Sequence, residues 1–571
     1  MRNSVTFVPC YSRRMDGVMV SHKFLQILYL MILLDHGGAY RRSVYILLPA
    51  VIGSLYWQVK RNGFLVVVDK TEQLLLGLII ISALCGAYLG IDTGDSIYGM
   101  IRLATILLSF LSLLQWKESE REGCFIWLSY IGAVCVVAGI VIKVVPFLNH
   151  VFLGFFSKTG RLAGPFGYSN SMALFLLLGI VVLEYSEKVR KRCLQLILCF
   201  GVLLTGSRFA FVLLCCYIGY LFLKNRKNSG LFGIVFFAMA LAVGIYSRKR
   251  EELSVIGRFL TINLTASTLQ GRILYWEDAC KMLFQYPCGT GYMGYFYLQQ
   301  ELQTGVYNVR FVHNDWLQCM LDYGILAGIG AAVFFLKELC SKKKMSRDKD
   351  IIVLTGMYSF FDFHLQFLGI FLPVLLAVSQ TNMTIRCPIK RKGILLGVMI
   401  AVIMLAVFAG LSEQAGKRED YKTALRWNPY STEYRMAQML NSPDLAIAES
   451  RAEKILKQNQ WVYAAYKIKS NAAAERGEIA KFIENRKKAL SLRKYDMKEY
   501  EEYFRILYSF YIIVEEEERW EEKEMCIEAL KEIPKILDMI KRETSLRAYY
   551  LEDMPQMDFS YDYQTFIALL E

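Results

Sequence analysis

The sequence predicts an all-α protein, in which a polytopic helical membrane core of about 12–13 transmembrane helices precedes a soluble, repeat-like helical domain. Three observations support this fold class. The 571 residues are 55% hydrophobic and 14% aromatic, which is typical of a membrane protein rather than a globular one. Two long apolar runs are each interrupted near the middle by polar residues, and the composition becomes polar after residue 411.

Hydrophobic segments recur along the first part of the chain. Many Lys and Arg residues lie in short loops between them, so membrane topology explains the net charge of +14 without a nucleic-acid partner. With a cytoplasmic N-terminus, the odd number of spans that we read places the C-terminus outside. We read the spans near residues 24–40, 45–59, 73–91, 99–116, 125–148, 171–185, 193–205, 209–223, 230–246, 315–336, 351–363, 366–381 and 393–411.

The apolar runs 193–223 and 351–381 are each too long for one span, since either would measure roughly 46 Å as a helix against ~30 Å of hydrocarbon. Basic clusters flank both ends of each run, and two crossings per run place all of these clusters in the cytoplasm. The polar interruptions at 206–208 and 362–364 are therefore expected on the outer side. Arg208 would line a recessed, water-accessible cavity there, because the span before it is only about 20 Å long.

The chain is expected to divide into a membrane core, residues 1–411, and an extracytoplasmic helical domain, residues 412–571. The core includes a long external loop, residues 247–314, and a second polar segment, residues 157–170, on the same side. In the C-terminal domain similar helical patterns recur at intervals near the tetratricopeptide period of about 34 residues. An irregular helical domain is the alternative interpretation.

Several polar residues on the predicted outer side are candidates for chemistry. Arg161 and Asn170 bracket a flexible segment that suits recognition of a headgroup or sugar, although the same residues also make a turn and a helix cap. Arg208 carries a guanidinium, which stays charged at low dielectric and binds phosphate through two hydrogen bonds, with snorkelling to the interface as the alternative. Asp362 and His364 fall on the same outer side, where the packing of a helix hairpin is one explanation for them.

His313 and Asn314 end the long loop immediately before an apolar run. A histidine exchanges protons near neutral pH and can accept one from a sugar hydroxyl, although a lone histidine is more often structural. Earlier in the loop, Arg272 opens an amphipathic stretch together with Tyr275 and Trp276. Each of these signals is weak when taken alone.

Taken in order, the signals resemble the O-antigen ligase and polymerase family. The similarity extends over roughly residues 160–330 by motif and 24–411 by hydropathy. It rests on Arg161-Leu-Ala-Gly-Pro-Phe-Gly-Tyr-Ser-Asn170, Leu204-Thr-Gly-Ser-Arg208, Gly271-Arg272 with Trp276, Gly289-Thr-Gly291, and His313-Asn-Asp-Trp-Leu-Gln318 followed by Tyr323-Gly324.

The resemblance implies a GT-C type glycosyltransferase in the bacterial cytoplasmic (plasma) membrane, acting on its outer side. It would transfer an oligosaccharide from undecaprenyl or another polyprenyl diphosphate to an acceptor hydroxyl with inversion, and would need no cofactor or metal ion. Arg208 and Arg272 would hold the diphosphate, and His313 would be the general base. The residues implicated in substrate binding are Arg161, Asn170, Ser207, Asn314, Asp362 and His364. Of these, Asp362 and His364 would support acceptor binding, with the packing of a helix hairpin as the alternative.

The functions that the resemblance leaves open differ in the molecule that accepts the glycan. A polymerase joins lipid-linked repeat units of a cell-surface polysaccharide and needs no second class of acceptor, so we favour it. A ligase that transfers the glycan to a lipid or a protein would share the same donor site. A transporter or flippase for lipid-linked glycans is the alternative from another class, but such proteins tend to show internal repeats, which are not evident here. The C-terminal domain would bind a protein partner or control chain length.

Overall fold

The computed structural model describes residues 16–152, 154–187, 191–224, 232–241, 266–342, 344–379, 384–389 and 392–570. These residues are mostly helical, which confirms the predicted all-α class. The first helices are α1 (Asp16–Leu34), α2 (Arg41–Asn62), α3 (Lys70–Tyr88), α4 (Thr93–Leu114), α5 (Glu118–Val144), α6 (Pro146–Val151), α7 (Ser169–Glu184), α8 (Lys191–Thr205), α9 (Arg208–Lys224) and the helix Phe232–Leu241. The next are α12 (Ser267–Gln285), α13 (Gly294–Leu302), α14 (Asp315–Tyr323), α15 (Ile325–Cys340), α16 (Ser346–Tyr358), α17 (Leu368–Ser379) and α18 (Lys392–Lys417).

Within the described residues, four helices are long and apolar enough to cross a bilayer: α3, α4, α5 and the part of α18 from Leu396 to Lys417. Shorter apolar helices accompany them, among them α7 and α17. The chain is therefore a multi-pass helical membrane protein. The total of about 12–13 spans stays a prediction, because several of the predicted spans are too short to be recognised by length.

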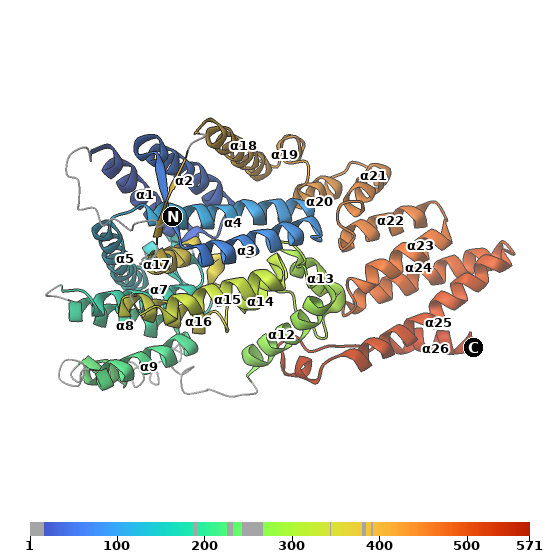
Figure 1. Cartoon of the computed structure of the whole chain (residues 1–571). Coiled ribbons are helices and arrows are strands. Elements are labelled where there is room, and N and C mark those ends of the chain that lie inside the picture. The colour runs from blue at the N-terminus through green and yellow to red at the C-terminus, as the bar shows by residue number, and fades with distance from the viewer. Residues whose placement is uncertain are drawn as a thin grey trace.

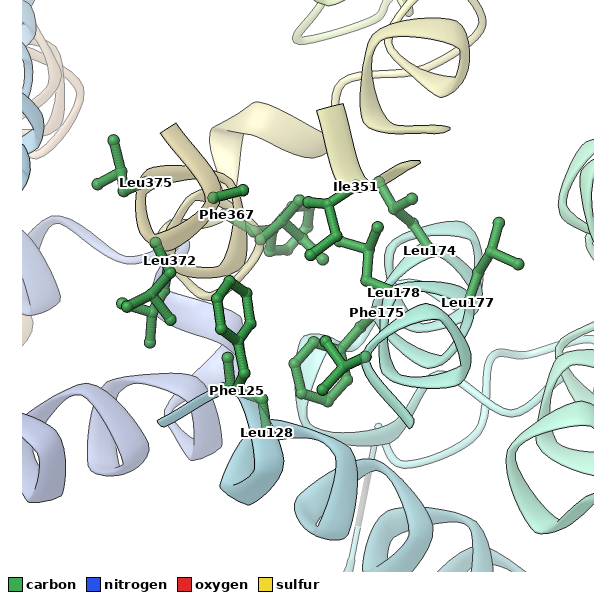
Figure 2. Close-up of a cluster of buried hydrophobic side chains, with 14 of the residues drawn as sticks. Phe125, Leu128, Leu174, Phe175, Leu177, Leu178, Ile351, Phe367, Leu372 and Leu375 are labelled. Carbon is green, nitrogen blue, oxygen red and sulfur yellow. The ribbon is translucent and has the colours of Figure 1, made fainter. Parts of the chain in front are cut away.

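Helix α7 lies at the centre of the membrane core. From Met172 to Leu183 every side chain is buried, as expected for a helix that is apolar on all faces. Figure 2 shows its side chains packed among those of three neighbouring helices: Phe125 and Leu128 from α5, Leu174, Phe175, Leu177 and Leu178 from α7 itself, Ile351 from α16, and Leu372 and Leu375 from α17. This apolar packing holds the ends of these helices in place. The polar segments are attached to those ends.

Both predicted interruptions of the long apolar runs are present. Helix α8 ends at Thr205 and α9 begins at Arg208, with Gly206 between them at φ 59°. Helix α16 ends at Tyr358 and α17 begins at Leu368, with the short 3₁₀ helix η4 (His364–Gln366) in the connection. Each run therefore forms two short helices joined by a polar turn.

A third break was not predicted. The segment 315–336, which we expected to be one span, is divided into α14 and α15 at Gly324. Gly324 has φ 92°, and a Cβ atom there would lie 2.8 Å from the carbonyl oxygen of Cys288 and 2.7 Å from Ser82 Oγ. The segment is therefore not one continuous helix, because close backbone approach, rather than a polar residue, ends α14. Its count as one span stays a prediction.

Two short strands were also not predicted. Strand β1 (Phe64–Val68) follows α2, and it pairs antiparallel with β2 (Thr384–Pro388), which precedes α18. The amide side chain of Gln115 hydrogen-bonds both backbone groups of Val66 on the other edge of β1, at 3.0 and 2.8 Å. The early and late parts of the membrane core are thus joined directly.

The C-terminal domain consists of successive helices, each packed against the next. They extend from the membrane helices on the side of α12 and α13, as Figure 1 shows. Helix α18 continues through the predicted boundary at residue 411, and the tetratricopeptide character of the domain stays a prediction. Its elements are α19 (Tyr421–Trp427), α20 (Thr432–Leu440), α21 (Leu445–Leu456), α22 (Tyr463–Glu475), α23 (Ile479–Ser491), α24 (Met497–Glu516), α25 (Trp520–Glu543), the 3₁₀ helix η5 (Leu546–Tyr550) and α26 (Tyr561–Leu569).

Candidate functional site

The polar segments that the sequence singled out lie together at one end of the core helices. The backbone N–H of Leu162 donates to the carbonyl of Leu204 at 3.0 Å, and that of Asp315 donates to the carbonyl of Ser359 at 2.8 Å. Between these segments lies a cavity of about 280 Å³. The cavity is lined by Arg161, Asn170, Gly206, Ser207, Arg208, Phe209, Val212, Thr268, Leu269, Arg272, Tyr358, Phe361 and Asp362. Part of the predicted long loop, residues 247–265, lies outside the described residues, and the remainder contains α12 and α13.

Asp362, in the connection between α16 and α17, is the centre of the site and is only 1% exposed. Its carboxylate accepts hydrogen bonds from Tyr168 Oη at 2.9 Å, Asn170 Nδ2 at 2.7 Å and Arg272 Nη2 at 3.1 Å. It also lies 2.9 Å from His313 Nδ1. Burial raises the pKa of Asp362, but Arg272 and His313 outweigh burial and hold the pKa well below its usual range. The carboxylate is therefore ionised.

His313 is held in an unusual backbone conformation beside this carboxylate. Its φ of 57° lies in the left-handed region, which non-glycine residues occupy rarely and often at functional sites. The indole N–H of Trp276 donates to the carbonyl of His313 at 3.3 Å, and the Phe363 ring packs edge-on at 4.8 Å. Because an ionised carboxylate only accepts hydrogen bonds, His313 donates through Nδ1, and in the neutral ring Nε2 then carries the lone pair.

Three arginines line the cavity. Arg161 donates to the Thr205 carbonyl and to Asn170 Oδ1, each at 2.7 Å, which joins two of the polar segments. Arg208 is the first residue of α9, so the N-terminal end of that helix also faces this region. Arg272, on α12, completes the set from a third element. Guanidinium groups and a helix N-terminus together favour a polyanionic ligand.

Of the remaining predicted residues, Ser207 lies in the cavity wall, whereas Asn314 and His364 have structural contacts elsewhere. Ser207 lines the cavity, and its hydroxyl lies 2.6 Å from that of Tyr358. Asn314 caps α14, since its Oδ1 accepts from the backbone N–H groups of Trp316 and Leu317. His364 is fully buried with Nδ1 2.9 Å from Ser171 Oγ, and burial lowers its pKa to about 4. Asn314 and His364 do not line the cavity, and neither does His313. His313 adjoins the lining through its contact with Asp362.

Sequence reasoning missed two tyrosines and the central position of Asp362. Tyr168 lies inside the segment 161–170 that was singled out, but nothing in that segment indicates a carboxylate partner from another helix. Tyr358 lies in an apolar run, where an aromatic residue predicts only packing. The contacts of Asp362 span three distant parts of the chain, so only the fold reveals them.

These features define a class: a multi-pass helical membrane protein with an arginine-lined cavity, suited to a polyanionic headgroup, beside a carboxylate-held histidine. Residues 193–332 match the family described as O-antigen ligase. The chain therefore carries a domain of the O-antigen ligase family, as the resemblance predicted, and this family points to membrane glycan assembly. The matched region contains Arg208, Arg272 and His313. No curated protein and no solved structure matches the chain.

Proposed function

We propose that the protein is a membrane glycosyltransferase that transfers a glycan from a polyprenyl diphosphate to an acceptor hydroxyl at this cavity. The observation that carries the proposal is the convergence of Arg161, Arg208 and Arg272 on one cavity, next to the Asp362–His313 pair. The O-antigen ligase domain supports the same chemistry. In keeping with the predicted topology, the cavity would open on the outer side of the bacterial plasma membrane.

The arginines would stabilise the leaving group. As the glycosidic bond breaks, negative charge builds on the departing diphosphate, and guanidinium groups already placed at that point lower the barrier. Arg208 and Arg272 come from two different helices that line the cavity, α9 and α12, and would bind the diphosphate together. The contact of Arg272 with Asp362 at 3.1 Å fixes the direction of its side chain before substrate arrives.

The Asp362–His313 pair would activate the acceptor. With Nδ1 held by the carboxylate, Nε2 of neutral His313 takes the proton of the acceptor hydroxyl as the oxygen attacks the anomeric carbon. The new carbon–oxygen bond forms while the bond to the diphosphate breaks, so the anomeric configuration inverts. The proton remains on His313, and the ionised Asp362 stabilises the resulting imidazolium.

We favour polymerisation of lipid-linked repeat units, because the acceptor is then the same class of molecule as the donor. Transfer to another lipid or to a protein is the alternative and would use the same donor groups. A flippase would need cations for the diphosphate but has no evident use for a histidine held by an ionised carboxylate. The geometry of that pair therefore favours transfer over transport.

The test is a reconstituted assay with a polyprenyl-diphosphate oligosaccharide, in which lipid-linked products are resolved by size. We expect the wild-type protein to form a ladder and His313→Ala to form none. His36→Ala, which removes an exposed histidine of the 3₁₀ helix η1 (His36–Gly38), should behave as wild type. Transfer only after a second acceptor is added would identify a ligase. Movement of intact lipid across the bilayer with no transfer under any acceptor condition would refute the enzymatic proposal.

A further inference from the structure

The last part of the C-terminal domain packs against the helix that carries Arg272. Residues 545–551, here called the C-terminal clamp, comprise η5 and one residue on either side. Two clamp residues, Ala548 and Leu551, form one buried apolar cluster with Leu274 of α12 and Tyr307. All four side chains are at most 9% exposed, so the contact is part of the folded interior rather than a loose surface contact.

Polar contacts reinforce this apolar cluster. Arg547 of the clamp donates to Gln270 Oε1 at 2.8 Å and to Glu277 Oε1 at 2.9 Å, so it spans two turns of α12. The backbone N–H of Ser545 donates to the carbonyl of Thr304 at 2.9 Å. Thr304 in turn donates through its backbone N–H to the buried Asp278 of α12 at 2.8 Å. The clamp is thereby joined to α12 directly and through the loop that follows α13.

Two glycines allow the clamp to approach so closely. A Cβ atom at Gly305 would lie 2.7 Å from Ala548 Cβ and 2.8 Å from Leu274 Cδ2. At Gly271, beside Arg272, a Cβ atom would lie 3.2 Å from Leu551 Cδ2. The Gly271-Arg272 pair in the sequence therefore has a physical explanation, since the glycine makes room for the clamp and the arginine reaches the site.

Helix α12 has two functional faces. Gln270, Leu274 and Glu277 recur at intervals of four and three residues, so they share the face that the clamp covers. Arg272 and Trp276, four residues apart, share the face that reaches the Asp362 carboxylate and the His313 carbonyl. A shift of α12 under the clamp would therefore move a donor-binding cation and the support of the general base together.

We infer that the C-terminal clamp is a positioning element of the transfer site, which fixes α12 and through it Arg272 and His313. This inference rests on the proposed function and assigns the C-terminal domain a part in the reaction itself. The domain has a second attachment far from the clamp, where Asp92 at the start of α4 accepts from Thr432 and from Asn459 Nδ2, the latter at 3.0 Å. Releasing the clamp therefore leaves the domain attached.

The test uses the full-length protein with Ala548→Phe, which forces the clamp away from Gly305 and Leu274. Ala548→Gly keeps the clamp seated and is the conservative control. Leu530→Ala, in the separate buried cluster to which α22 to α26 contribute, loosens the C-terminal domain without touching α12. We expect kcat/KM for the lipid-linked donor to fall between about tenfold and a hundredfold in Ala548→Phe, with a rise in KM, and to change little in both controls.

Hydrogen exchange supplies a readout that does not depend on activity. In purified protein, Ala548→Phe should accelerate amide exchange in α12, residues 267–285, whereas Leu530→Ala should accelerate exchange only within the C-terminal domain. Unchanged exchange of α12 in Ala548→Phe, or an equal loss of kcat/KM in Leu530→Ala, would overturn the inference. If wild-type protein transfers no glycan, the proposed function fails, while exchange in α12 still decides whether the clamp holds that helix.

Discussion

At the scale of single residues, Asp362 connects the two halves of the proposed reaction. It contacts Arg272 on the donor side and His313 on the acceptor side. We expect Asp362→Asn to reduce kcat by about 10²–10⁴-fold, because the amide has no charge to stabilise an imidazolium and can present its NH₂ group to His313. Initial rates of transfer at saturating donor measure this effect.

A second aspartate provides a matched control for this substitution. Asp350, on α16, accepts a hydrogen bond from Tyr185 Oη at 2.8 Å and does not line the cavity. Asp350→Asn should retain transfer rates close to those of the wild-type protein. An equal loss of transfer rate in the two variants would contradict the proposed role of Asp362. It would show that the loss of either carboxylate impairs folding of the bundle.

The lowered pKa of Asp362 predicts how its contribution to stability depends on pH. An aspartate whose folded-state pKa is depressed stabilises the protein fully above its unfolded-state value, near 3.9, and loses this effect only as pH falls through the folded-state pKa. The difference in thermal unfolding between wild type and Asp362→Asn should therefore not become smaller between about pH 7 and about pH 5. A difference that shrinks over this interval would mean that Asp362 is not held ionised.

At the scale of elements, the break between α14 and α15 depends on one glycine. Gly324 combines φ 92° with ψ 158°, a region that side chains other than glycine scarcely enter. Gly324→Ala should destabilise the protein by about 1–3 kcal/mol through backbone strain, in addition to the clash with Cys288. The measurement is the thermal unfolding temperature of the purified protein. Gly356→Ala in α16, where a Cβ atom meets nothing within 4 Å, should leave that temperature unchanged or slightly raise it.

The helix breaks also show how much of the structure could be predicted from the sequence. The breaks after Thr205 and Tyr358 were predictable, because polar residues interrupt apolar runs that are too long for one span. The break at Gly324 was not, since it depends on the carbonyl of Cys288 from another segment. In the site, Arg208, Arg272 and His313 were recognised by residue type and order, whereas the hydrogen bonds to Asp362 depend on long-range packing that no local pattern encodes.

At the scale of the whole molecule, several contacts attach the C-terminal domain to the membrane core, among them the clamp on α12. Another is made by Asp92, which is 1% exposed, caps α4 and accepts hydrogen bonds from Thr432 and Asn459. Asp92→Ala removes a helix cap, at a cost of about 0.5–2 kcal/mol, and leaves two buried donors without their acceptor. We expect limited proteolysis to cleave more quickly between α18 and α20.

A cap in the exposed part of the same domain is the control for this change. Asp444 caps α21 through the backbone N–H of Ile447 at 2.7 Å. Asp444→Ala removes a cap of the same kind without touching α4. Proteolysis between α18 and α20 should stay at the wild-type rate in this variant. Faster cleavage in Asp444→Ala as well would show that general loosening of the domain, not loss of its attachment, exposes the segment.

The pairing of β1 with β2 has a consequence for biosynthesis. Strand β1 leaves the ribosome early, whereas its partner is synthesised only just before α18. At 5–20 residues per second, the roughly 300 intervening residues take roughly 15–60 s to translate. During that interval the backbone groups of β1 have no strand partner, although Gln115 can already bind Val66. The first two helices can insert early, but the connection between them and α3 reaches its final form only when nearly the whole membrane core has been made.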